Sequence, residues 1–261
     1  MVYTYYGGIQ KEKRSKIPTL IGVVAALLLA VSLFAFQRAF AAPGIVYTQK
    51  SFNDLSLVTD RTAPSGGYTI TPNDTLKLKI DNTLASAADG FYRTEGLQGT
   101  IPASQAIRAK LFVDKAWHGK QIRAGLWGIT KDAANDTAWP IIEYTTVGDN
   151  SFTGWRVFDT MNGGWTNLTG VKAKAGHWYK LEIAFNSTTK SYDYYVDSDK
   201  VYSLTAVDPT SPTDVYSSFT GVIFNNKNFA TANHTDDYTV QWKKFAYGTA
   251  FDCSRNGWKN L

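Results

Sequence analysis

The chain has 261 residues, 14% of them aromatic, with 27 basic residues, 22 acidic residues and a single cysteine. The positive charge is concentrated at the start, because residues 1–41 hold five basic residues and one acidic residue, which leaves 22 basic and 21 acidic residues in 42–261. The linear sequence of 42–261 shows no Lys/Arg patch, so we expect no nucleic-acid partner. Cys253 alone excludes an internal disulfide, and no Cys/His spacing is typical of a zinc site.

The first 41 residues have the order typical of an export signal. Basic residues gather at 11–16, an uncharged apolar run of 20 residues fills 17–36, and the tripeptide Ala39-Phe40-Ala41 follows. This order predicts a secretory signal peptide or, since the run is long enough to span a bilayer, a membrane anchor helix; we favour cleavage after Ala41. Either way, the remainder is expected to be extracellular or on the outer face of the cytoplasmic membrane, touching the membrane only through this segment.

Residues 45–250 show one strand-like run after another, followed by a tail at 251–261. Apolar and polar residues alternate strictly in 76–81, in 179–185 and in 192–197. Further candidate strands lie at 106–114, 121–130, 141–145, 154–159, 219–225 and 238–245. A period of two places one face in a core and the other in water, and no amphipathic helical stretch follows residue 36. We therefore predict one all-β domain over 45–250, with two antiparallel sheets packed as a sandwich.

Four short motifs add a family resemblance. They are A-G-H-W-Y-K-L-E-I at 175–183 followed by Y-D-Y-Y-V-D at 192–197, G-L-W-G at 125–128, S-F-N-D at 51–54, and V-Q-W-K-K-F at 240–245. Together they resemble the concanavalin A-like lectin/glucanase superfamily, which includes the laminin-G-like jelly rolls, over about residues 49–250. The resemblance implies a jelly roll whose first and last strands, near Phe52 and 240–245, lie side by side. In this superfamily a saccharide is often bound on the concave face. The resemblance does not imply catalysis, because the fold hosts lectins, enzymes and inert spacers.

Alternation in the three middle strands points to a candidate binding face. If those strands are neighbours, five side chains that point away from the core share one face: Arg123, Trp127, Glu143, Arg156 and Phe158. An aromatic ring stacks on the C–H face of a pyranose, while guanidinium and carboxylate groups bind hydroxyls. On this interpretation Trp127→Ala abolishes binding and leaves thermal stability nearly unchanged. The alternative is a cross-strand salt-bridge ladder of the three charged residues, with Trp127 covered by a loop.

Three functions remain open at this point. The favoured one is a non-catalytic binding module, with a carbohydrate or surface glycan as its ligand. A glycoside hydrolase would need a pair of carboxylates, and Glu143 with Asp159 is the only candidate pair, although Asp159 is expected to point inward. A polysaccharide lyase would need a Tyr/His pair near an Arg, and His177 lies in a different hairpin. The third option is a structural surface domain that binds no small ligand.

No cofactor is expected, although a structural calcium ion is an alternative. Asp197 and Asp199 could supply oxygen ligands, as could Asp236 and Asp237. The stronger interpretation of Asp197–Asp199 is a hairpin turn, because the segment separates two strand-like runs.

Overall fold

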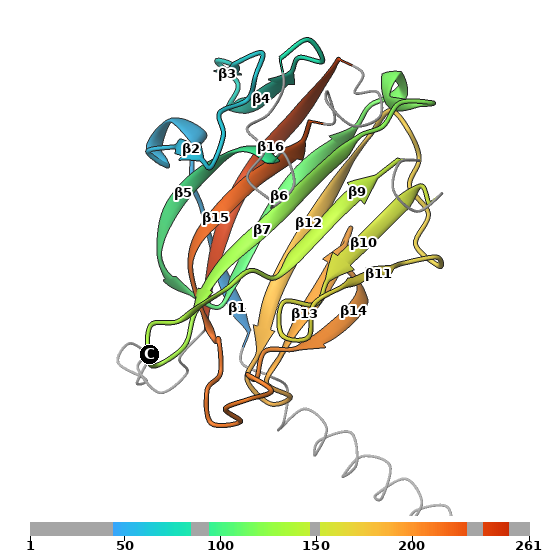
Figure 1. The fold of residues 1–261 in the computed structure, drawn as a ribbon. Helices are drawn as coiled ribbons and strands as arrows, with labels where there is room; N and C mark the ends of the chain where they lie inside the picture. The colour runs from blue at the N-terminus through green and yellow to red at the C-terminus, as the bar shows by residue number, and fades with distance from the viewer. Residues whose placement is uncertain (1–43, 85–93, 147–151, 229–236, 251–261) are drawn as a thin grey trace, which may run out of the picture. The chain divides into compact units, whose positions relative to one another are not determined.

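The computed structural model describes residues 44–84, 94–146, 152–228 and 237–250, which form two antiparallel β-sheets packed face to face (Figure 1). The predicted sandwich of two antiparallel sheets is therefore confirmed. The predicted export segment 1–41 and the tail 251–261, with Cys253, lie outside the described residues. Within the described ranges, no helix has the length and apolar character needed to span a bilayer.

The first sheet is ordered β14-β13-β12-β6-β16-β4-β3, and β1 pairs with β16. Its strands are β1 (Ile45–Gln49), β3 (Tyr68–Ile70), β4 (Thr75–Ile80), β6 (Ala106–Val113), β12 (His177–Asn186), β13 (Ser191–Val196), β14 (Asp199–Thr205) and β16 (Tyr238–Ala250).

The second sheet is ordered β11-β10-β9-β7-β15-β5-β2, and β8 pairs with β7. Its strands are β2 (Val58–Asp60), β5 (Thr94–Ser104), β7 (Arg123–Lys131), β8 (Thr137–Ala138), β9 (Ile141–Thr145), β10 (Gly154–Phe158), β11 (Trp165–Asn167) and β15 (Ser218–Lys227). The strand that enters between β5 and β7 is β15, from near the end of the chain, so this sheet joins segments far apart in sequence (Figure 1).

The core lies between the two sheets and is built from the alternate residues of each strand. Leu76, Leu78 and Ile80 of β4 are fully buried, as are Trp155 on the opposite sheet and Trp242 on β16. Aromatic rings pack edge to face across this layer. Since the core uses one face of each sheet, the other face of each remains available for function.

The first strand of the fold differs from the sequence prediction. Residues 52–54 form a short 3-10 helix, η1 (Phe52–Asp54), because the Ser51 hydroxyl accepts the Asn53 N–H and donates to Asp74 Oδ1 at 2.8 Å. The strand that lies beside β16 is instead β1, in register from Ile45 opposite Ala250 to Gln49 opposite Ala246. The first and last strands are thus adjacent, as predicted, but the first strand begins seven residues before Phe52.

Leu181→Ala tests which face of β12 is buried. Leu181 is fully buried in the core, so truncation removes its apolar contacts and leaves a cavity. We expect the free energy of unfolding to fall by about 2–5 kcal/mol, measured by urea denaturation. Glu182→Ala, on the opposite face of the same strand, is the matched control and should have a smaller effect. A loss below about 1 kcal/mol for Leu181→Ala would mean that β12 faces the other way.

Candidate functional site

The outer face of the second sheet carries two neighbouring cross-strand rows, which cross β7 two residues apart at Trp127 and Gly125. The first row is apolar and runs through Ile223, Trp127, Ile141, Phe158 and Trp165, each opposite the next on adjacent strands. The second row is polar at both ends and runs through Asn225, Gly125, Glu143, Arg156 and Asn167. All five side chains singled out from the sequence belong to this face, since Arg123 lies two residues before Gly125.

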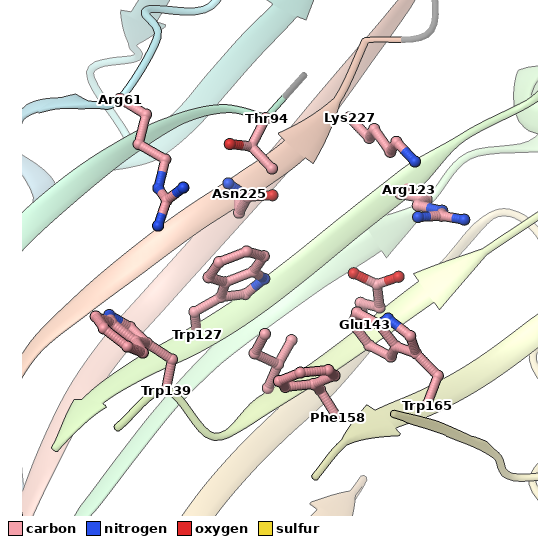
Figure 2. Close-up of a pocket in the computed structure, with 11 residues that line it drawn as sticks. Arg61, Thr94, Arg123, Trp127, Trp139, Glu143, Phe158, Trp165, Asn225 and Lys227 are labelled. Carbon is pink, nitrogen blue, oxygen red and sulfur yellow. The ribbon is translucent and has the colours of Figure 1, made fainter. Parts of the chain in front are cut away.

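A cavity of about 80 Å³ opens on this face (Figure 2). One side of its wall is apolar and consists of Trp127, Trp139, Ile141, Phe158 and Trp165. The other side is polar and consists of Arg61, Thr94, Arg123, Glu143, Asn225 and Lys227. The volume is well below the roughly 300–1,000 Å³ of sites that enclose a drug-sized molecule, so the cavity suits one ring or the end of a larger ligand.

Glu143 is held by a buried ion pair. Arg156 donates from Nε to Glu143 Oε1 at 2.6 Å, and its Nη2 contacts the same oxygen. The Arg156 guanidinium also stacks on the Trp165 ring, with 4.0 Å between its central carbon and the ring centroid. Arg156 is only 2% exposed and lies outside the cavity lining, so its structural role is to orient Glu143 and Trp165. The salt-bridge alternative raised from the sequence is confirmed for this pair.

Three polar atoms of the cavity wall are buried without a hydrogen-bond partner among the described residues. They are Thr94 Oγ1, Trp127 Nε1 and Asn225 Nδ2. Buried polar groups are nearly always paired, and an unpaired one carries a desolvation penalty of about 1–3 kcal/mol. A ligand with hydroxyl groups could pair with these atoms if the wall side chains shift to expose them, because a hydroxyl both donates and accepts.

Gly125 gives the Trp127 indole its place in the wall. A Cβ at residue 125 would lie 2.8 Å from Trp127 Nε1 and 3.0 Å from Glu143 Cβ. The bare backbone therefore lets the indole nitrogen lie over the neighbouring polar row, between the strands that carry Asn225 and Glu143. The first glycine of the G-L-W-G motif is therefore required locally, because it leaves room for the Trp127 indole.

No protein-family model and no curated protein matches the sequence. Among solved structures, the laminarinase from Flavobacterium sp. UMI-01 is 13% identical, covers 79% of this chain and 100% of its own, and superposes with a TM-score of 0.51. A Bacillus licheniformis β-glucanase is also 13% identical over 80% of this chain and 99% of its own, with a TM-score of 0.48. The basic winged bean lectin with Tn-antigen is 10% identical over 78% and 98%, with a TM-score of 0.46. The chain has the concanavalin A-like jelly-roll fold.

Asp159, the carboxylate considered as a catalytic partner for Glu143, belongs to a turn and does not line the cavity. Asp159 Oδ1 accepts the backbone N–H groups of Met161 and Asn162, and Oδ2 accepts the Asn162 amide. Asp159 thereby fixes the turn between β10 and β11, and Glu143 is the one carboxylate among the described residues of the cavity wall. His118 and His177 are exposed and do not line the cavity, and His234 lies outside the described residues.

The calcium alternative stays a prediction. Asp197 and Ser198 adopt left-handed conformations, with φ of 52° and 82°, and Asp197 Oδ1 accepts the Lys180 N–H at 2.8 Å. This is the hairpin turn that the sequence favoured for Asp197–Asp199. Within the described ranges no group of three acidic, histidine or cysteine side chains could hold a metal ion, and Asp236 lies outside them.

Sequence reasoning missed seven residues of the cavity wall. Asn225 ends a strand that had been predicted, so the same alternation could have placed it on this face, but nothing indicated that β15 is the neighbour of β7. Lys227 lies two residues further along the same strand, and Ile141 begins the predicted strand that carries Glu143. The other four come from strands and connecting segments that were not predicted: Arg61, Thr94, Trp139 and Trp165. Trp139 is 41% exposed and precedes Pro140 in a connection between strands, a context in which aromatic residues have no periodic signal.

Proposed function

We propose that this jelly roll is a non-catalytic carbohydrate-binding module, exported to the cell surface or secreted. The observation that carries the proposal is the cavity, in which aromatic rings face polar atoms that lack a protein partner among the described residues. Trp127, Trp139 and Trp165 offer surfaces for the C–H face of a sugar ring. Thr94, Asn225 and the oriented Glu143 offer hydrogen bonds to its hydroxyl groups. The fold alone does not choose between binding and hydrolysis, so the argument rests on these side chains.

A secreted glycoside hydrolase is the second candidate, because Glu143 lines the cavity. A glycosidase of the usual type needs two carboxylates about 5–9.5 Å apart across one bond. The ion pair with Arg156 occupies Glu143 Oε1, and Asp159 is committed to a turn. These contacts support the role of Glu143 as an oriented hydrogen-bond acceptor for a ligand hydroxyl.

A glycan array probed with residues 42–261 tests the proposal. We expect a restricted set of bound glycans, and no release of reducing sugar from any bound glycan during prolonged incubation. Glu143→Gln is the diagnostic variant. In a binding module it changes affinity only modestly, because the amide oxygen still accepts a hydrogen bond. The contrary result has two parts: the wild type releases reducing sugar, and Glu143→Gln lowers that rate by orders of magnitude while it still binds the glycan. Together they would establish a hydrolase instead.

A further inference from the structure

The outer face of the first sheet, on the opposite side of the domain core from the cavity, is strongly basic. The eight strands of this sheet contain eight Lys or Arg residues and three acidic residues, a net charge of +5, whereas residues 42–261 as a whole have a net charge of +1. The basic residues that alternate with buried ones, and so share the outer face, are Lys77, Lys79, Arg108, Lys110, Lys180 and Lys243. The linear sequence shows no such patch, because these basic residues are brought together only by the pairing of strands distant in sequence.

Three of these lysines are aligned directly across three adjacent strands. Lys243 of β16 is opposite Lys110 of β6, which is opposite Lys180 of β12. Strands are about 4.8 Å apart, so this row brings like charges together, an arrangement that destabilises a sheet. Partial burial, followed by the charges of Lys110 and Lys244, lowers the pKa of Lys243. A row of this kind makes sense where an anionic partner compensates for the repulsion.

The acidic residues of these strands already have partners. Glu182 is opposite Arg108 and accepts the Tyr47 hydroxyl at 2.6 Å. Asp193 pairs with Lys200 at 2.9 Å. Asp199 begins β14 at the edge of the sheet, away from the lysine row. Asp197, in the turn after β13, accepts the Lys180 backbone N–H, and Lys180 Nζ donates to Ser198 Oγ at 2.7 Å. No carboxylate among the described residues forms a salt bridge with Lys110, Lys180 or Lys243, so the charge of the row is compensated only in part, at its Lys180 end.

An aromatic pair adjoins the lysine row. Phe112 and Trp178 are opposite each other, with ring centroids 5.2 Å apart, and each lies two residues along its strand from a lysine of the row. Lys243 Nζ lies 3.8 Å from the centroid of the Trp178 ring. Both rings are partly exposed. The face thus combines ring surfaces and cations within a few ångströms of each other.

We propose that this basic face, centred on Lys110, Lys180 and Lys243, binds an anionic polysaccharide, with its carboxylate or sulfate groups on the lysines and its sugar rings against Phe112 and Trp178. Charge complementarity selects a polyanion, and the flat row of cations suits a chain with regularly spaced charges. The aromatic pair favours sugar rings over an anionic bilayer, because one face of Trp178 is already covered by Lys243 rather than projecting for insertion. The predicted export favours a surface glycan over a nucleic acid.

The test compares polymers of different charge. The full chain, kept soluble with a non-ionic detergent, is titrated with polygalacturonate, heparin and neutral dextran at low and moderate salt. We expect binding to the two anionic polymers but not to dextran, and a marked loss of affinity as salt screens the charges. Lys110→Glu with Lys243→Glu should weaken polymer binding at least tenfold. Lys172→Glu with Lys174→Glu makes the same charge change on an exposed loop away from the row and should alter it less than twofold.

Two further measurements keep the proposal decidable. If the charge-reversed protein has a lowered melting temperature, Lys110→Gln with Lys243→Gln replaces it, and a folded Gln variant must still lose most of the binding. Polygalacturonate binding that Trp139→Ala abolishes and the Lys110/Lys243 variants retain would place the polymer in the cavity of the other sheet and overturn the proposal. Equal losses in the two Glu double variants would overturn the proposal. Duplex DNA and phosphatidylglycerol vesicles are titrated in parallel. If the protein binds only one of these two, and the Lys110/Lys243 variants lose that binding, the partner is a nucleic acid or a membrane and the proposal is overturned.

Discussion

Glu143→Ala is expected to lower the free energy of unfolding by about 3–5 kcal/mol, because it leaves Arg156 charged, buried and without its partner. Arg156 is 2% exposed, and both of its contacts with Glu143 are to a single oxygen, so truncation of this one side chain removes the whole ion pair. The Trp165 ring that stacks on the guanidinium should lose its fixed position as well. Urea denaturation measures the stability, and glycan binding should disappear together with the oriented carboxylate.

A double variant is the control for this prediction. Replacing both partners by apolar residues of similar size, as in Glu143→Leu with Arg156→Met, leaves no unpaired charge and should recover most of the lost stability. Glycan binding should stay lost in the double variant, since a leucine side chain cannot accept a hydrogen bond. If Glu143→Ala alone lost less than about 1 kcal/mol, the guanidinium would have to be hydrated, and the ion pair would not fix the cavity wall.

The sequence was sufficient for the fold and for the face of the sheet on which the cavity lies. The pleat of a strand has a period of two, so a stretch such as residues 121–130 states directly which side chains share a face. Arg123, Trp127, Glu143, Arg156 and Phe158 were placed on one face for this reason, and the registers of β7, β9 and β10 agree.

How deeply each side chain is buried, and which distant strands pair with each other, could not be predicted in the same way. Alternation does not say that Trp165 covers Arg156, or that β15 brings Asn225 beside Gly125 from a distant part of the chain. The basic face was hidden for a related reason. Its basic residues occur singly or in pairs at 77 and 79, at 108 and 110, at 180 and at 243, and only the strand order β12-β6-β16-β4 gathers them. A charge count along the chain averages them with acidic residues of distant loops.

Trp127→Ala and Trp139→Ala should separate stability from binding at the cavity. Both residues line it, but Trp127 is 7% exposed and packs with Ile141 and Ile223, whereas Trp139 is 41% exposed. We expect Trp127→Ala to abolish glycan binding and also to lower the free energy of unfolding by about 3–5 kcal/mol, as for a buried tryptophan. The sequence-based expectation of nearly unchanged stability is thus revised by the burial of the indole in a second apolar cluster.

Trp139→Ala is the variant that isolates the ligand contact. Trp139 is far more exposed than Trp127, so truncation should change the free energy of unfolding much less than Trp127→Ala does, by about 1 kcal/mol at most. Loss of a stacking surface should nevertheless weaken binding of the array-identified glycan about tenfold, which corresponds to about 1.4 kcal/mol. Thermal melting and calorimetric titration of the same preparation measure both quantities. Wild-type affinity in a folded Trp139→Ala protein would show that the ligand does not reach the exposed rim, and would confine the site to the wall formed by Trp127, Phe158 and Trp165.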